Sequence, residues 1–276
     1  MVRLLSVALI GRDKFSTVVA SLDALLADLP PNSDVKIFDP GYPPSILDKI
    51  RSLSRLSCHP ISIFPTTRFA NTNYVWNQFV SVANGKYLLN LENDVIVQNG
   101  CIGDCIDAIE TGFCDIAVPK VFEEFQSNVH YNPTVSEIID VEGGGILSKL
   151  DRGRDAVVPI AGGRKVKHLE RHCFIMSKTT AKRLGTLDEQ MYCRTDYDMS
   201  FACHRSGIVI GIPPIASVTL SSKLNSEIDR EFYEFRWDAN RVALANRRLI
   251  DKWKLVGFKT TIHHVDEARA RLMPSE

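Results

Sequence analysis

Two carboxylates stand two residues apart immediately after an apolar run. The run is Tyr87–Leu91 (YLLNL), and Glu92-Asn93-Asp94 follows it directly. A short apolar run predicts a buried strand, so both carboxylates should lie just beyond its end. Carboxylate oxygens suit Mg²⁺ and Mn²⁺, which commonly complete their coordination shell with water and substrate phosphates. The pattern predicts a divalent-metal site with Asp94 as main ligand and Glu92 nearby. The alternative is an inert, solvated acidic turn.

A second acidic group, Thr195-Asp196-Tyr197-Asp198, stands at the start of a helix predicted over Tyr197–Arg205. One interpretation is structural: Thr195 caps the helix, and the carboxylates favour its positive end. The other is catalytic: Asp196 acts as a general base that the helix end keeps ionised. Asp198 lies two residues further on and so points about 200° around the helix axis from Asp196. We therefore expect Asp198 to stabilise the first turn or to hold a neighbouring loop.

The elements that must position these carboxylates alternate regularly over the first 120 residues. Apolar runs predict strands at Leu4–Ile10, Val35–Phe38, Ile61–Phe64, Tyr87–Leu91 and Ile116–Val118. Helical spacing predicts a helix after Ser16, its expected N-cap, and others over Ile46–Leu53, Asn73–Ala83 and Cys101–Glu110. This alternation predicts a mostly parallel α/β sheet with helices on both faces. Ligands of such sheets bind beyond the carboxyl ends of the strands, which makes the polar residues there candidates: Gly11–Asp13, Asp39 and Glu92–Asp94.

The second half of the chain is less regular. Residues 120–168 hold glycine-rich tracts with little periodicity, which predicts a long loop region with the role of a lid. Strands are expected at Cys173–Ser177 and Ile208–Ile212, and a single tail helix at Glu231–Lys254.

Composition narrows the classes of function. The 276 residues include 33 basic and 33 acidic side chains, and this balance argues against nucleic-acid binding as the main function. Seven cysteines, an odd number in mostly apolar surroundings, predict buried free thiols in a reducing cytoplasm. No apolar run reaches the roughly 18 residues of a transmembrane helix, and we interpret the N-terminus as a strand rather than a signal peptide.

The order and spacing of these motifs resemble the family 2 glycosyltransferases of the GT-A fold. The family's first strand, polar loop and first helix are similar to SVALIGRDKFSTVVASLDALL. Its second strand, ending in an Asp that contacts the nucleotide base, resembles VKIFDPGYPP. The Asn-bearing helix before the metal motif resembles RFANTNYVWNQFVSVANG. The strand, D-x-D motif and next strand resemble YLLNLENDVIVQNG, with Glu92 in place of the first Asp.

Later segments extend the resemblance. The acceptor side of the family, which ends in a Glu-Asp pair, resembles HCFIMSKTTAKRLGTLDEQMYCRTDYDMSFACHRSGIVIGIPP. There Asp196 matches the catalytic Asp, and Thr195 replaces the Glu. The family's late N-R-x-x-F-x-x-K-W helix is similar to NRRLIDKW at Asn246–Trp253. The resemblance covers nearly the whole chain except residues 120–168 and the C-terminal end.

The resemblance implies an α/β, GT-A-like fold: a Rossmann-type, mostly parallel sheet with helices on both faces and a C-terminal helical tail. It implies inverting transfer from a nucleoside-diphosphate sugar, with a UDP-sugar as first candidate, assisted by Mn²⁺ or Mg²⁺. The acceptor would be a hydroxyl or amine on a glycan, a lipid-linked glycan, or a small or carrier-bound molecule. Residues 1–120 are expected to form the nucleotide-sugar-binding half, 121–222 the acceptor-binding and catalytic half of the same domain, and 223–276 the tail.

The resemblance also assigns roles to residues of the site. Asp196 is the expected catalytic base, and Asp94 with Glu92 the expected metal ligands. The expected donor-binding residues are Gly11, Arg12, Asp39, Arg68, Asn73, Asn77 and Asn93. The expected acceptor-binding residues are Glu170, Arg171, His172, Thr195 and Asp198.

Two departures from the family pattern leave alternatives open. Many relatives carry a His shortly after the strand that follows the catalytic helix, whereas Ser217–Ser222 contains none, so metal binding is weaker or another group completes the site. Thr195 in place of Glu leaves the acceptor hydrogen bonding undefined. His168 and His172 could share a helix face, but we interpret them as surface or acceptor-loop histidines. The alternatives are a non-catalytic nucleotide- or glycan-binding protein and a nucleotidyltransferase, although the glycine-rich first loop of the latter is absent.

Overall fold

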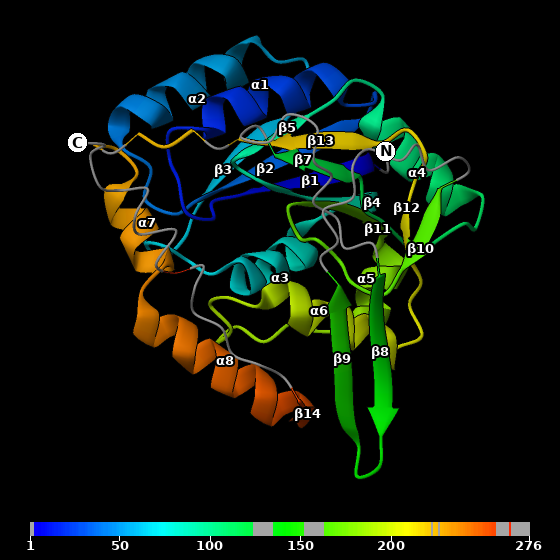
Figure 1. The fold of residues 1–276 in the computed structure, drawn as a ribbon. Helices are drawn as coiled ribbons and strands as arrows, with labels where there is room; N and C mark the ends of the chain where they lie inside the picture. The colour runs from blue at the N-terminus through cyan, green and yellow to red at the C-terminus, as the bar shows by residue number, and fades with distance from the viewer. Residues whose placement is uncertain are drawn as a thin grey trace.

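The computed structural model describes residues 3–123, 135–151, 163–221, 223–225, 227–257 and 265. This part of the chain is organised around an eight-stranded sheet (Figure 1). Its strands, in the order in which they lie side by side, are β10 (Arg164–Val166), β12 (Ile210–Ile212), β6 (Ile116–Ala117), β11 (Cys173–Ser177), β4 (Gly85–Glu92), β1 (Arg3–Ile10), β2 (Ser33–Asp39) and β3 (Ile61–Pro65).

The strands β4, β1, β2 and β3 run parallel to one another, whereas β11 is antiparallel to both β4 and β6. The predicted mostly parallel sheet is therefore confirmed. Ile10 of β1 pairs in register with Phe38 on one side and with Glu92 on the other. Because these strands end at one level, the polar residues that follow them meet at the same edge of the sheet.

Helices cover both faces of the sheet, as predicted (Figure 1). One face packs against α1 (Val18–Asp28), α2 (Pro44–Leu56) and α4 (Cys101–Glu110), and the other against α3 (Thr72–Val82), α5 (Lys178–Leu184) and α6 (Thr195–Arg205). Side chains of β1 alternate between the two faces of the sheet. Val7 and Leu9 lie in the core under α1, α2 and α4, and Ala8 and Ile10 lie in the core under α3, α5 and α6. Fully burying each larger side chain of this kind contributes about 1.5–3 kcal/mol.

The described parts of 120–168 contain strands, so the prediction of a continuous loop there was wrong. β7 (Lys120–Glu123) joins β5 (Val95–Val97) and β13 (Ser217–Leu220), and β8 (Val135–Val141) forms a hairpin with β9 (Gly145–Asp151) that is extended by β14 (Leu255–Val256). Gly143 and Gly144, with φ of 81° and 76°, make the hairpin turn. The rest of the predicted lid, 124–134 and 152–162, lies outside the described residues.

The predicted single tail helix is two helices, α7 (Arg230–Arg236) and α8 (Ala239–Trp253). The chain breaks at Trp237-Asp238, because Asp238 takes the N-cap of α8 and its side chain accepts a hydrogen bond from the Arg241 amide at 2.9 Å. Val242 and Leu249 of α8 pack in one core cluster with Tyr197 and Phe201 of α6 and the hairpin. The tail therefore braces the helix that carries Asp196.

Ser16 does not cap α1 as predicted. The helix begins at Val18, and Thr17 occupies its N-cap without a side-chain hydrogen bond. The Ser16 hydroxyl donates instead to Asp229, far along the chain, at 2.6 Å. The contact between Ser16 and the distant Asp229 therefore replaces the helix cap that the local sequence predicted.

All seven cysteines lie in the described part of the chain and are free, and each is buried except Cys58, which is exposed. Buried free thiols are therefore confirmed at six of the seven positions. Among the described residues, no helix combines the length and apolar character needed to cross a membrane.

Candidate active site

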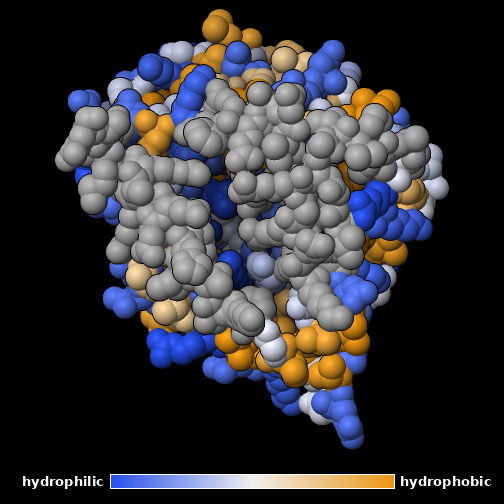
Figure 2. Space-filling view, viewed as in Figure 1, coloured by the Kyte–Doolittle hydropathy of each residue, from blue (hydrophilic) through white to orange (hydrophobic). Residues whose placement is uncertain are grey.

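A cavity of about 460 Å³ lies at the carboxyl edge of the sheet, within the size range of small-molecule sites. Figure 2 shows hydrophilic residues, coloured blue, near the middle of the molecule in this view. The side chains that line the cavity include carboxylates (Glu92, Glu170 and Asp196), arginines (Arg12, Arg171, Arg194 and Arg236) and aromatics (Phe69, Tyr192, Tyr197, Phe232, Phe235 and Trp237). Such a lining suits a ligand with both phosphate and ring groups.

Glu92, the last residue of β4, is buried between two basic side chains, those of Arg12 and His172. One of its oxygens lies 2.7 Å from His172 Nδ1 and 3.2 Å from an Arg12 guanidinium nitrogen. Burial alone would raise the pKa of Glu92, but Arg12 and His172 outweigh it and hold that pKa at about 2. The same pairing raises the pKa of His172, although burial and Arg12 oppose the rise. Glu92 is thus kept as a carboxylate.

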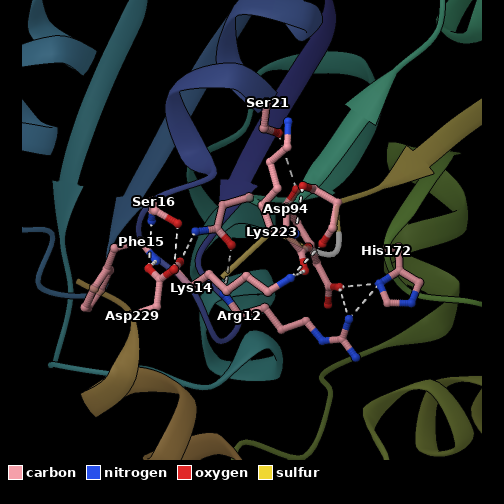
Figure 3. Close-up of polar contacts among 12 residues, drawn as sticks. Arg12, Lys14, Phe15, Ser16, Ser21, Asp94, His172, Lys223 and Asp229 are labelled. Atoms are coloured by element: carbon pink, nitrogen blue, oxygen red, sulfur yellow. Dashed lines mark hydrogen bonds and ion pairs between the residues drawn. The ribbon is translucent and has the colours of Figure 1, made fainter. Parts of the chain in front are cut away.

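Asp94 is equally buried and faces Lys14 (Figure 3). Lys14 Nζ lies 3.4 Å from Asp94 Oδ2 and donates a hydrogen bond of 2.7 Å to the carbonyl of Ser221, in the segment after β13. The Ser221 amide donates to the Asp94 carbonyl at 2.8 Å, which fixes this segment against the strand end. Burial raises the pKa of Asp94, and Lys14 opposes the rise. Among the described residues, Asp94 Oδ1 has no hydrogen-bond partner, and it is buried.

The residues of this cluster fit a divalent cation. Glu92, Asp94 and His172 each offer one ligand atom, and these atoms lie within 4.8 Å of one another. The unpartnered Asp94 Oδ1 is the kind of buried oxygen that a cation satisfies. His172, which the sequence suggested for the acceptor side, lies here as the nitrogen of the cluster. It contributes a histidine to a site for which Ser217–Ser222 provides none.

Asn93 ties the loop after β1 to the end of β4. Its Oδ1 accepts from the Arg12 amide at 3.3 Å, and its Nδ2 donates to the Lys14 carbonyl. Gly11 is needed for close packing, since a Cβ there would lie 2.5 Å from Pro40 Cγ. Both residues shape the loop that carries Arg12 and Lys14.

Four other predicted donor-binding residues do not line the cavity. Asp39 Oδ1 accepts from the amides of Gly41 and Tyr42 at 2.8 and 2.7 Å, which makes a turn. Arg68 pairs with Glu231 at the surface.

The other two are asparagines on α3, and both hold the segment before α6. Nδ2 of Asn73 donates to the Asp188 carbonyl at 2.9 Å, and Nδ2 of Asn77 donates to the Leu187 carbonyl at 2.9 Å. The direct nucleotide contacts expected of these four residues remain predictions.

Asp196 lies in the first turn of α6, and its side chain, 22% exposed, lines the cavity. Arg194, with φ of 62°, takes the N-cap position, so Thr195 is the first helical residue and not the cap. Asp198 is 1% exposed and does not line the cavity. It accepts from Trp253 Nε1 and Lys252 Nζ, both at 2.7 Å, and so holds α8. The two carboxylates therefore have different surroundings.

The segment His168–Cys173 enters β11 beside the cavity, and its two histidines do not share a helix face. His168, Glu170, Arg171 and His172 are all buried, contrary to the interpretation of surface histidines. Arg171 donates to the side chain of Asn73 and, at 3.1 Å, to the Thr72 carbonyl. Burial lowers the pKa of Arg171 to about 10 against the opposing effect of Glu92, Asp196 and Asp198.

The sequence did not identify the aromatic wall contributed by α7. The rings of Phe69 and Phe232 are stacked with centroids 4.8 Å apart, and Phe235 lies 4.9 Å from Phe69. Phe69 has φ of 56°, an uncommon conformation for a non-glycine residue that marks sites of backbone strain. A regular apolar stripe on a helix is typical of a core, so only the fold could show that this one faces a cavity.

Asp229 anchors α7 to the loop after β1 (Figure 3). It is fully buried and accepts hydrogen bonds from the amides of Phe15, Ser16 and Asn225 and from the Ser16 hydroxyl, at 2.6–2.9 Å. We expect Asp229→Ala to lower the free energy of unfolding by about 3 kcal/mol or more, because several donors lose their partner. Urea unfolding followed by circular dichroism measures this, with Asp251→Ala on exposed α8 as the control. A loss below about 1 kcal/mol would contradict the anchoring role.

A family model, described as glycosyl transferase family 2, matches residues 6–184. The structure of GalNAc-T7 with UDP, GalNAc and Mn²⁺ is similar, with a TM-score of 0.61 and 11% identity over 99% of this chain and 54% of that one. The structure of S. aureus TarS 1-349 in complex with UDP is similar with a TM-score of 0.57 and 12% identity, over 98% and 70% of the two chains. Comparison with curated protein sequences gives no match.

The chain spans about half the length of GalNAc-T7, and at these identities the likeness to both structures shows the fold. The family match covers well over half of the chain and includes Arg12, Glu92, Asp94 and His172, but it ends before Asp196. On the extent of that match, this chain belongs to glycosyl transferase family 2.

Proposed function

We propose that this protein transfers a sugar from a nucleoside-diphosphate sugar, with UDP as the first candidate nucleotide, to an acceptor hydroxyl or amine. The observation that carries the proposal is that a single cavity is lined by Glu92 and His172 of the carboxylate cluster and by Asp196. Donor and acceptor chemistry can therefore meet in one space. The UDP in both similar structures supports the choice of nucleotide.

Arginines are the proposed partners of the donor phosphates. Guanidinium groups bind phosphate oxygens with directional, charge-assisted hydrogen bonds. Arg12 lies at the carboxyl end of β1 beside Glu92, and Arg236 reaches the cavity from α7. Nη1 of Arg236 is buried without a hydrogen-bond partner in the described structure, so a phosphate oxygen there would satisfy it.

Asp94, Glu92 and His172 are the proposed ligands of Mn²⁺ or Mg²⁺. When bound, such an ion offsets the negative charge that develops on the diphosphate leaving group. Lys14 adds a positive charge at the same strand end, fixed by Asp94 and the Ser221 carbonyl. The Mn²⁺ of the GalNAc-T7 structure supports this assignment.

Asp196 is the proposed general base. As the acceptor oxygen or nitrogen bonds to the anomeric carbon, the bond from that carbon to the diphosphate oxygen breaks, and Asp196 takes the acceptor proton. Attack from the face opposite the diphosphate inverts the anomeric centre. Thr195 lines the cavity beside Asp196 and is the proposed acceptor contact where relatives carry Glu.

Nucleotide binding tests the proposal directly. We expect UDP with Mn²⁺ to raise the melting temperature, because a ligand that binds only the native state stabilises it by RT ln(1 + [L]/Kd). A thermal-shift panel of UDP, GDP, CDP and ADP, each with Mn²⁺ or EDTA, identifies the base. Arg12→Ala should reduce the nucleotide-induced shift, whereas Arg51→Ala on the exposed face of α2 should not. No shift with any of the four nucleotides would overturn the proposal.

A further inference from the structure

We propose that His168, Glu170 and Asp196 form a second metal site, for a divalent first-row ion that favours tetrahedral coordination, such as Zn²⁺. The site rests on the proposed function only in that Asp196 belongs to both. Its other two residues take no part in the donor chemistry described above. Its ligand atoms are also different from those of the cluster at Glu92, Asp94 and His172.

Three hydrogen-bond acceptors converge at this point. His168 Nε2 lies 3.5 Å from Asp196 Oδ2 and 3.7 Å from Glu170 Oε1, and the three ligand atoms are within 4.8 Å of one another. His168 and Glu170 are 2% and 3% exposed. Both His168 Nε2 and Glu170 Oε1 are buried without a hydrogen-bond partner in the described structure. Buried polar atoms of this kind call for a ligand.

Ser200 fixes the tautomer of His168. The Ser200 hydroxyl donates its single proton to the Asp196 carbonyl at 2.6 Å and accepts from the Leu169 amide at 2.9 Å. Its contact of 3.2 Å with His168 Nδ1 must therefore use the proton on Nδ1. This leaves the lone pair of Nε2 directed at the two carboxylates. Metal-binding histidines usually donate their second N–H to a neighbouring group in this way.

The distances from His168 Nε2 to the two carboxylates favour a bound metal ion over a direct hydrogen bond. An N–H···O hydrogen bond spans about 2.7–3.2 Å, so 3.5 and 3.7 Å are too long for it. Ligands of a tetrahedral ion at about 2.0–2.2 Å are separated by about 3.3–3.6 Å, so the 3.5 Å separation lies inside this range and the 3.7 Å separation just beyond it. An organic ammonium is a poorer fit because both unpartnered atoms are closed to solvent.

Glu170 connects the two clusters. Its Oε1 faces His168, and its Oε2 lies 3.9 Å from His172 Nε2. An ion bound at Asp196 Oδ2 would fix that carboxylate at the cavity wall, where the proposed base must meet the acceptor. The second site therefore serves to position the proposed base.

Metal titration of the chelator-stripped protein tests the site. Co²⁺ is the probe, since it replaces Zn²⁺ and its visible absorption is intense only in tetrahedral sites. Asp94→Asn removes the main ligand of the first cluster, so a tetrahedral Co²⁺ spectrum that persists in this variant reports the second site alone. We expect one Zn²⁺ per chain in the same variant by equilibrium dialysis and elemental analysis.

His168→Gln in the Asp94→Asn background should weaken Zn²⁺ and Co²⁺ binding at least tenfold, as loss of even an outer-shell partner costs about 10–100-fold. His204→Gln removes a different described histidine, which pairs with Asp140, and should leave binding unchanged. If His168→Gln fails to fold by circular dichroism, Glu170→Gln takes its place with the same expectation.

Unchanged metal affinity in the His168 or Glu170 variant would overturn the second site, as would the absence of a tetrahedral Co²⁺ spectrum. Failure of the proposed function is a separate result. It would appear as no UDP-induced thermal shift in the wild-type protein, whether or not Zn²⁺ binds.

Discussion

Asp196→Asn should lower the rate of sugar transfer by about 10²–10⁴-fold while nucleotide binding stays nearly unchanged. The substitution keeps the shape of the side chain and removes its ability to take a proton. Asp196 lines the cavity, so a group there can come within hydrogen-bond reach of an acceptor. Transfer is measured as product formed at saturating donor, and binding as the UDP-induced thermal shift.

Asp198→Asn is the matched control, two residues along the same helix. Asp198 is buried against Trp253 and Lys252 of α8 and does not line the cavity. Its loss should lower the melting temperature of the protein. The transfer rate per folded molecule should stay close to that of the wild type. If the Asp196→Asn protein is active and the Asp198→Asn protein is folded but inactive, the general base has been assigned to the wrong carboxylate.

Asp94→Ala should weaken Mn²⁺-dependent UDP binding by about 100-fold or more. A metal clamp contributes several kcal/mol of charge stabilisation, and each 1.4 kcal/mol or so is a factor of ten in affinity. The buried Oδ1 of Asp94, which has no hydrogen-bond partner in the part of the chain that the structure describes, is the atom that the substitution removes from the cluster. Isothermal titration with UDP in Mn²⁺ and in EDTA isolates the metal-dependent part of the affinity.

Asp48→Ala, at an exposed carboxylate of α2, is the control and should behave as the wild type. We expect the Asp94 variant to remain folded, because Lys14 keeps its hydrogen bond to the Ser221 carbonyl, and circular dichroism checks this. Equal Mn²⁺-dependent affinity in the variant and the wild type would remove Asp94 from the metal site.

The sheet and its flanking helices could be predicted because their signals are local. The alternation of Val7, Ala8, Leu9 and Ile10 between two cores requires apolar residues throughout β1, and the sequence has them. The same runs place the polar residues that follow the strands at one edge, which located Glu92 and Asp94 before the fold was known.

Contacts between distant segments could not be predicted in this way. Ser16 has the side chain of an N-cap, but Asp229, more than two hundred residues later, takes its hydroxyl. The Gly143–Gly145 tract predicts a loop equally well whether or not the flanking strands pair into a hairpin. Asp238 could cap a helix start, but the apolar stripe of the tail runs past it and hides the break.

Only part of the candidate site could be predicted from the sequence, because its other residues come from segments that are distant in the chain. His172 stands 80 residues from Glu92 in sequence, and only the pairing of β11 with β4 brings them together. Asn73 and Asn77 have the residue type of ligand contacts, but their amides tie α3 to the turn before α6. The apolar residues of α7 resemble a core stripe, and the fold alone shows that they form a cavity wall.

We propose that this chain catalyses sugar transfer from a nucleotide sugar with Asp196 as the base. The decisive experiment follows UDP release from a panel of UDP-sugars with Mn²⁺ and candidate acceptors, for the wild type and for Asp196→Asn. We expect acceptor-dependent release by the wild type that falls at least about 100-fold in the variant. A wild type that binds UDP with Mn²⁺ but releases none above the variant's rate, with any acceptor, would contradict it and indicate a non-catalytic nucleotide-binding protein.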